Sequence, residues 1–132
     1  MIVIDASVLA NVVGDDESDG RRARAELRGV GDIAAPDLVD VETVSVLRKR
    51  WLAGTVADER FAAAVDDLAQ LDLLERYPTL RFMRRAFELR ANVTACDSAY
   101  VALAEELDCD LLTADQRLAS ATGPRCHIRV LR

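Results

Sequence analysis

Short apolar runs alternate with longer amphipathic stretches along this chain. The short runs predict strands at residues 2–4, 32–35, 72–77, 110–113 and 127–131. The longer stretches predict helices at residues 6–13, 21–28, 36–53, 55–71, 79–91, 94–107 and 116–120. Strands that alternate with helices are typical of a parallel sheet with helices on both faces. The pattern therefore predicts an α/β fold, with a single domain over residues 1–132 and no linker or repeat.

The first predicted strand ends abruptly at a carboxylate. Ile2, Val3 and Ile4 form a continuous β-branched run, which is typical of a strand buried on both faces, and Asp5 follows directly. Loops at the carboxyl ends of parallel strands are where open α/β sheets bind ligands. The pattern thus predicts that Asp5 lies at the mouth of a crevice where other acids converge.

The helix predicted at residues 36–53 has the clearest periodic pattern in the sequence. Apolar side chains recur there at helical spacing, at Leu38, Val41, Val44, Leu47 and Trp51. Glu42 interrupts this apolar stretch, and its position alone leaves open whether it faces solvent or the interior. The acidic segment at residues 14–20 is bounded by glycines and predicts an exposed loop.

The charge balance is acidic, with 23 Asp and Glu residues against 17 Lys and Arg residues. This balance argues against a polybasic protein that binds nucleic acid by neutralising phosphates. It is compatible with carboxylates that hold a cation beside a phosphate substrate. Basic clusters at residues 21–24, 48–50 and 81–85 are typical of solvated helix faces, with phosphate binding as the alternative.

The three cysteines, Cys96, Cys109 and Cys126, are odd in number and show no close pairing motif, which favours a reducing compartment. Cys126 and His127 are adjacent but have no further ligands at zinc-finger spacing, so a zinc site is not expected. No apolar run is long enough to cross a bilayer, and the first residues do not resemble a signal peptide. We expect a soluble, cytoplasmic protein without a membrane partner.

Four acids fall where this topology would bring them together. Asp5 ends the first strand, Asp115 follows the strand at 110–113, and Asp97 lies in the first turn of the helix at 94–107. These positions share the carboxyl edge of a parallel sheet, and Glu42 is early enough in its helix to reach the same edge. The sequence predicts a cluster of four carboxylates.

Each acid also has a purely structural explanation. Asp5 and Asp115 fit the N-caps of the helices that follow them, and Thr94 to Asp97 fit a capping box. Capping does not explain why acids occupy three separate ends on one side of the sheet. Converging carboxylates repel one another and raise one another's pKa values unless a cation neutralises them. Ligands that are all oxygen select Mg²⁺ or Mn²⁺, so a divalent-cation site is the favoured interpretation.

A cation held by carboxylates can activate water, orient a phosphodiester and stabilise the leaving oxygen. The sequence contains no G-x-S-x-G elbow, no P-loop and no G-x-G-x-x-G motif. Its one histidine, His127, lies in the last predicted strand, where a core or edge position is expected rather than a general base. The sequence therefore offers no catalytic machinery other than the predicted cation site.

Four segments, taken in order, resemble the PIN-domain ribonucleases and, among them, the VapC toxins of prokaryotic toxin–antitoxin pairs. They are Ile4–Ser7, Val41–Glu42, Cys96–Ala104 and Leu112–Leu118. The resemblance spans the whole chain and implies that Asp5 and Asp97 bind Mg²⁺, or alternatively Mn²⁺. It implies that Glu42 and Asp115 complete the acidic catalytic pocket, while Ser7 and Thr113 support the ligands by hydrogen bonds.

The resemblance also implies an activity and partners. VapC toxins are endoribonucleases that cut tRNA or ribosomal RNA to arrest translation, and a cognate VapB-like antitoxin inhibits them. Members commonly form homodimers, and the toxin–antitoxin complex often represses its own operon. Residues 48–50 and 81–85 become candidates for RNA contact. Residues 8–13 and 38–52 become candidates for antitoxin or dimer surfaces.

Other functions compatible with this pattern are a PIN-domain nuclease without a toxin role and a non-catalytic binding module. A receiver-type signalling domain pairs adjacent acids at the first strand with a lysine at the last strand, but the only lysine, Lys49, lies inside a predicted helix. A haloacid-type phosphatase would need a second aspartate two residues after Asp5, where Ser7 stands.

Overall fold

The computed structural model describes residues 1–132, and its centre is a five-stranded parallel sheet in the order β3-β2-β1-β4-β5. The strands are β1 (Ile2–Ile4), β2 (Ile33–Pro36), β3 (Leu74–Tyr77), β4 (Asp110–Thr113) and β5 (Ile128–Val130). The predicted parallel sheet is confirmed, with each strand within two residues of its predicted bounds. Because all strands run the same way, every strand-to-helix turn faces one edge of the sheet.

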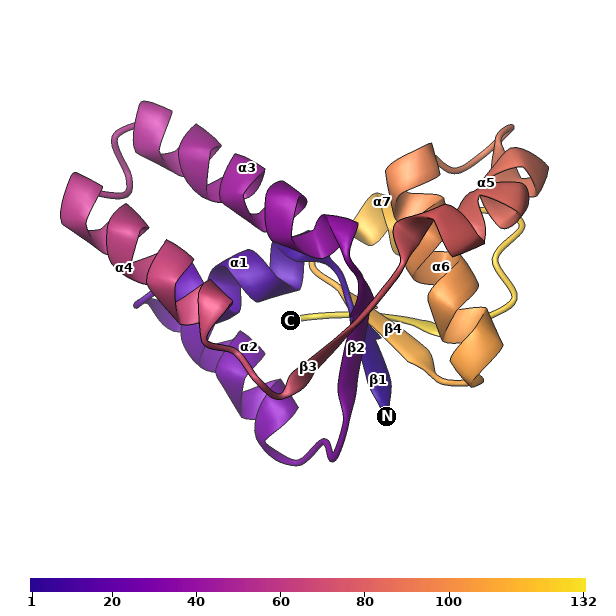
Figure 1. The fold of residues 1–132 in the computed structure, drawn as a ribbon, viewed down its shortest axis with the longest axis horizontal. Coiled ribbons are helices and arrows are strands. Elements are labelled where there is room, and N and C mark those ends of the chain that lie inside the picture. Colours follow the sequence, from indigo (N-terminus) through magenta and orange to yellow (C-terminus); the bar gives the residue numbers. More distant parts are fainter.

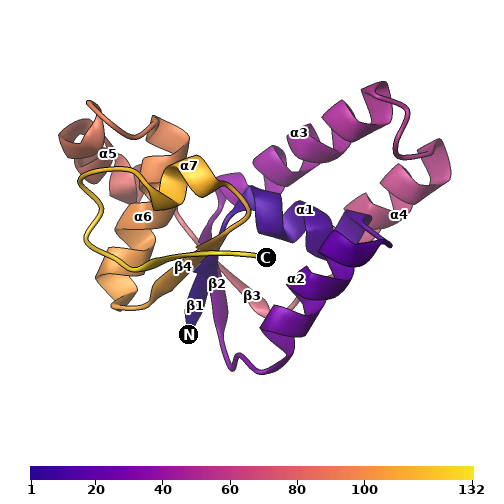
Figure 2. The same ribbon diagram turned by 180° about the vertical axis from the view of Figure 1, so that it is seen from behind.

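Helices cover both faces of the sheet, as predicted. They are α1 (Ala6–Gly14), α2 (Ser18–Arg28), α3 (Leu38–Leu52), α4 (Asp58–Ala69), α5 (Met83–Leu89), α6 (Ala95–Leu107) and α7 (Gln116–Ala119), with a 3₁₀ turn at Thr79–Phe82. Figures 1 and 2 show α1 to α4 grouped on one side of the sheet and α5 and α6 on the other. None of these helices is both long enough and apolar enough to span a lipid bilayer.

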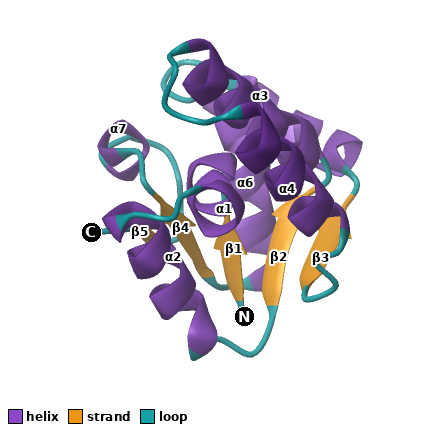
Figure 3. Ribbon diagram, turned by 90° about the vertical axis from the view of Figure 1, so that its left-hand side faces the viewer, coloured by secondary structure: helices purple, strands orange, loops and turns teal.

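The strand β1 lies in the middle of the sheet, between β2 and β4 (Figure 3). Its three apolar side chains are buried because α1 covers one face and α6 the other. Ile2 is in register with Ile33 on one side, and Ile4 is in register with Leu112 on the other. The chain leaves this central position at Asp5, which therefore emerges at the carboxyl edge between two neighbouring strand ends.

The loop predicted at residues 14–20 is shorter than expected, because α2 begins at Ser18. The chain folds back over the end of α1, where the Asp15 carboxylate accepts hydrogen bonds from the backbone N–H groups of Glu17 (2.7 Å) and Gly20 (3.2 Å). A Cβ at Gly20 would lie 1.8 Å from the Asp15 carbonyl oxygen. Gly20 is thus required for a close approach of backbone to backbone inside a helix rather than for a loop.

The buried face of α3 also differs from the predicted one. Val39, Thr43 and Leu47 are buried, whereas Val41 is 72% exposed. The reason is that α3 has apolar residues on two stripes, and its contact with α1 buries the stripe that contains Thr43. The second apolar stripe of α3, which contains Val41 and Trp51, faces outward beside α4.

Two smaller expectations were wrong. Residues 79–91 do not form one helix, because a 3₁₀ turn at Thr79–Phe82 precedes α5. Residues 8–13 do not form a partner surface, because most of α1 is buried in the core between the sheet and the surrounding helices.

Candidate functional site

Asp5 is a buried carboxylate, 5% exposed, at the junction of β1 and α1. Its Oδ1 accepts hydrogen bonds from the Ser7 hydroxyl (2.5 Å) and from the backbone N–H of Val8 (3.2 Å). Its Oδ2 accepts a hydrogen bond from the hydroxyl of Thr113, the last residue of β4. The carboxylate is therefore oriented from two adjacent strand ends, and Ser7 and Thr113 make the hydrogen bonds to it that the resemblance implied.

Ser7 also joins the two strand ends directly. While its hydroxyl donates to Asp5, the same oxygen accepts a hydrogen bond from the backbone N–H of Ala114 at 2.9 Å. The turn after β1 is thereby fixed against the turn after β4. The small residues that follow Asp5 in the sequence make this close approach possible.

The negative charge of the Asp5 carboxylate is not balanced by a cationic side chain. Burial raises the pKa of Asp5 above its ordinary value, and this effect outweighs the hydrogen bonds from Ser7, Thr113 and Val8, which lower it. The charge of Asp97 raises the pKa further. No Lys or Arg side chain forms an ion pair with Asp5. A buried carboxylate in this condition favours a bound cation.

Asp97 connects the other acids electrostatically. It is partly buried in the first turn of α6, where its backbone N–H donates to the hydroxyl of the N-cap residue Thr94 at 3.2 Å. Burial is the largest cause of its raised pKa, and the charges of Glu42 and Asp115 raise it further. The structure thus brings Asp97 within electrostatic range of all three other predicted acids.

Glu42 is held by a residue that the sequence analysis did not identify. The Tyr100 hydroxyl donates a hydrogen bond to Glu42 Oε1 at 2.6 Å, which links α6 to α3. Tyr100 is 1% exposed, and burial together with the Glu42 carboxylate raises its pKa. Tyr100 follows Asp97 by three residues on α6 and so shares its helix face, and a buried tyrosine hydroxyl needs a partner. The spacing places Tyr100 near Asp97, but its contact with Glu42 depends on how α3 and α6 come together in the fold.

Asp115 caps a helix, as its structural explanation predicted. Its Oδ1 accepts a hydrogen bond from the backbone N–H of Arg117 at 2.9 Å at the start of α7. The Arg117 guanidinium lies 3.5 Å from the same oxygen but is almost fully exposed. Oδ2 of Asp115 has no hydrogen-bond partner in the protein, so the cap occupies only one side of this carboxylate.

The four acids supply only oxygen donors, the ligand type that Mg²⁺ and Mn²⁺ prefer. Nowhere in the chain do three or more His, Cys, Asp or Glu side chains form a preformed metal cage. The residues fit a hard divalent cation bound by one or two carboxylates and completed by water, which is the usual arrangement for Mg²⁺. The buried and uncompensated carboxylate of Asp5 is the observation that supports this fit.

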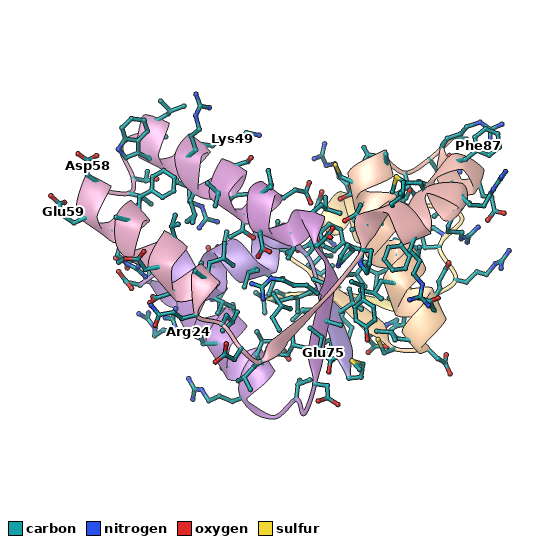
Figure 4. All side chains as sticks on the ribbon, viewed as in Figure 1. Arg24, Lys49, Asp58, Glu59, Glu75 and Phe87 are labelled. Carbon is teal, nitrogen blue, oxygen red and sulfur yellow. The ribbon has the colours of Figure 1, made fainter.

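The basic clusters contain both side chains that are paired with carboxylates and side chains that are exposed to solvent. In the 81–85 cluster, Arg81 pairs with Glu106 at 2.6 Å and Arg85 pairs with Glu105 at 2.8 Å. These carboxylates neutralise much of the positive charge that the resemblance made a candidate for RNA contact. Lys49 extends into solvent near the far end of α3 (Figure 4).

The chain matches the PIN domain family over residues 2–124. It is also 37% identical over 135 residues to Ribonuclease VapC9 of Mycobacterium tuberculosis, a match that covers 99% of this chain and 98% of VapC9. The protein belongs to the VapC ribonucleases of the PIN domain family. VapC1 of the same organism is 43% identical to this VapC-family chain over 99 residues, or 74% of each protein.

The fold of this VapC-family protein is also similar to that of VapBC2 from Rickettsia felis, whose structure was solved with a DNA fragment from the promoter. The TM-score is 0.71, the sequence identity is 14%, and the match covers all of both chains. At this level of identity the likeness concerns the fold alone. The α/β fold that the sequence predicted is that of the PIN domain.

Proposed function

We propose that this protein is a divalent-metal-dependent endoribonuclease and the toxin of a type II toxin–antitoxin pair. The observation that carries the proposal is the buried, uncompensated Asp5 at the carboxyl edge of the sheet, within electrostatic range of Asp97. Its VapC relatives, which are named ribonucleases, support the reaction class. Mg²⁺ is the proposed cofactor, with Mn²⁺ as the alternative.

In this proposal Asp5 and Asp97 hold the cation, while Glu42 and Asp115 complete the catalytic pocket. When bound, the cation would supply an activated water and charge stabilisation for the leaving oxygen of a phosphodiester. Asp5 keeps its orientation through its hydrogen bond with Thr113 and its contacts with the first turn of α1.

Tyr100 restricts Glu42 by holding one of its two carboxylate oxygens. The other oxygen, Oε2, remains available to position a water molecule or a cation-bound ligand. We propose that Tyr100 is a positioning residue, because its buried hydroxyl contacts Glu42 and does not itself reach the solvent.

The proposed substrate is RNA, in the form of tRNA or ribosomal RNA. The test is to incubate the purified protein with structured RNA in Mg²⁺ or in EDTA, beside the variants Asp5→Asn and Asp97→Asn. Asp72→Asn is a matched control, because Asp72 is exposed and its carboxylate has no hydrogen-bond partner. We expect cleavage by the wild type and the control in Mg²⁺ only. Cleavage that persists in EDTA and in both site variants would falsify the metal-nuclease proposal.

The proposed partner is a VapB-like antitoxin, which would bind beside the second apolar stripe of α3. A groove of about 540 Å³ lies between α3 and α4. Apolar residues and acids line it: Trp51, Phe61, Ala62, Val65, Asp58 and Asp66, together with Arg48. Its exposed Trp51 and Val65 favour occupation by an apolar segment of a partner. A homodimer across the same surface is the alternative occupant.

Expression of the protein with and without a small reading frame found immediately upstream of its gene would separate the toxin from the other candidates. Growth arrest that co-expression relieves supports a toxin. RNA cleavage without growth arrest would indicate a nuclease without a toxin role, and RNA binding without cleavage would indicate a binding module.

A further inference from the structure

Two of the three cysteines lie together at the opposite edge of the sheet from the acids. Cys109 directly precedes β4, and Cys126 lies two residues before β5. Both are partly buried and unpaired, and both line one open cavity of about 400 Å³. This cavity is formed by the end of α6 and the starts of β4 and β5, so it has no part in the proposed nuclease site.

The strand register places the two thiols beside each other. Leu111 is in register with Ile128, and its backbone N–H donates to the His127 carbonyl at 3.0 Å. One step earlier, His127 Nδ1 lies 3.5 Å from Asp110 Oδ1, so the alignment continues beyond the strand ends. One residue further back along each of these two segments, Cys109 lies opposite Cys126.

Residues opposite each other on adjacent strands are about 4.8 Å apart, which is within the Cα separation that a disulfide spans, roughly 4.4–6.8 Å. Cys109 and Cys126 also line the same cavity at the end of α6, and they are close enough for Cys109 to raise the pKa of Cys126. Cys96 is excluded as a partner. It lies in the first turn of α6, and the helix separates it from Cys109 by roughly 18 Å.

We propose that Cys109 and Cys126 form a reversible intramolecular disulfide in exchange with low-molecular-weight disulfides such as oxidised glutathione. One cysteine thiolate attacks a sulfur of the small disulfide, which forms a mixed disulfide and releases one small thiol. The second cysteine thiolate then attacks the protein sulfur of the mixed disulfide and releases the other small thiol. Two protein thiols are oxidised, and one small disulfide is reduced to two thiols.

Burial makes this exchange slow rather than preventing it. It raises the pKa of Cys109, and it raises the pKa of Cys126 to about 11. Because the thiolate is the reacting form, little of either thiol reacts at neutral pH at any moment. The same shielding would protect the disulfide once it has formed.

The disulfide would close a ring around the segment Asp110–Arg125. This segment includes β4, Thr113 and Asp115, and it leads to the edge strand β5, none of whose residues is fully buried. A cross-link at its base restricts the unfolded chain and therefore stabilises the folded protein.

The test treats the full-length protein with oxidised glutathione and then alkylates the remaining thiols before intact-mass and peptide analysis. Cys96→Ser is the matched variant, because Cys96 and Cys109 occur in one tryptic peptide, residues 91–117. In this variant we expect the intact protein to lose about 2 Da on oxidation and to take up no alkylating reagent. Peptide analysis should find residues 91–117 joined by a disulfide to residues 126–129. Oxidation should raise the melting temperature by roughly 10 °C in the wild type and in Cys96→Ser.

Cys109→Ser and Cys126→Ser should show no such increase, and their melting temperatures in reductant report whether they fold. Two alkylated thiols in Cys96→Ser after prolonged treatment would overturn the proposal. A disulfide between two chains, or one that involves Cys96 in the wild type, would overturn it equally.

Discussion

Replacing Thr113 with valine tests how the fold holds the central carboxylate. The hydroxyl of Thr113 donates to Asp5 Oδ2, and both residues are buried. Valine keeps the shape of the side chain but removes the hydroxyl. The charged oxygen of Asp5 then loses its donor, and the backbone N–H of Asp115 loses the acceptor that it has at 3.0 Å. Hydrogen bonds to charged groups contribute roughly 1.5–3 kcal/mol. We expect the free energy of unfolding at neutral pH to fall by about 2 kcal/mol, with a decrease in melting temperature of roughly 5–10 °C.

The loss should depend on pH in a defined direction. The hydrogen bond from Thr113 lowers the pKa of Asp5, so its removal raises the folded-state pKa further above the ordinary value. A raised carboxyl pKa in the folded state means that stability is lost as the pH rises through that pKa. The difference between Thr113→Val and the wild type should therefore be largest near pH 8 and shrink toward about pH 4, as Asp5 becomes protonated.

Thermal and urea unfolding of the metal-free protein across this pH range would measure the effect. Thr55→Val is a suitable control, because Thr55 is exposed and its hydroxyl donates to the carbonyl of Arg50 at 3.0 Å. Combining Thr113→Val with Asp5→Asn should remove the pH dependence of the difference. A loss that is equal at both ends of the pH range, or no larger than that of Thr55→Val, would refute this account of Asp5.

Three further predictions concern the site and the fold. The pKa values of Asp5 and Asp97 are both raised, so the metal-free protein should lose stability as the pH rises from about 4 to 8. Millimolar Mg²⁺ should restore this stability, and a stability that does not change with pH would count against the metal site. Tyr100→Phe should reduce RNA cleavage by roughly 10–100-fold at saturating RNA while KM changes little, and an equal rise in KM would contradict a positioning role. Gly20→Ala should lower the free energy of unfolding by more than about 2 kcal/mol. Gly29→Ala is the control and should be close to neutral, because no atom lies near the added Cβ. Equal effects of the two substitutions would show that the close approach at Gly20 relaxes easily.

The sheet could be predicted because its signals are local. A short apolar run such as Ile2–Ile4 has few alternatives to a buried strand, and alternation with helices then determines a parallel arrangement. The acids at Asp5, Asp97 and Asp115 followed from the same topology, because the positions after strands and at helix starts all meet at one edge. The prediction of the site therefore depended on the order of the elements and not on their exact bounds.

The remaining features depend on contacts between distant segments. The periodicity of α3 showed that the helix is amphipathic, but its apolar residues form two stripes, and only the packing against α1 selects the one that contains Thr43. The role of Gly20 depends on the carbonyl of Asp15, which returns to it only after the chain has turned. The partner of Glu42 is contributed by α6, far along the chain, and so position alone left its orientation open.

Capping and cation binding do not compete at this edge of the sheet. Asp5 and Asp115 each use Oδ1 to accept hydrogen bonds from the backbone N–H groups that open α1 and α7, which orients the carboxylates. Oδ2 takes no part in either cap: in Asp5 it accepts from the Thr113 hydroxyl, and in Asp115 it has no partner in the protein. The positive ends of these helices also make clustered negative charge tolerable before a cation binds. Asp97 and Glu42 are different, because neither side chain caps a helix: Thr94 is the N-cap of α6, and Glu42 contacts Tyr100.

This difference decides which substitutions separate folding from function. Asp5 is the N-cap of α1 as well as a proposed cation ligand. A loss of activity in a variant at this position therefore also includes the effect of losing the helix cap. The Asp97 side chain caps no helix, and burial and the neighbouring acids raise its pKa, so its charged form is disfavoured in the metal-free protein. Asp97→Asn should therefore raise the stability of the metal-free protein at neutral pH while abolishing cleavage. A variant that is both more stable and inactive is the result that a merely structural role for Asp97 could not produce.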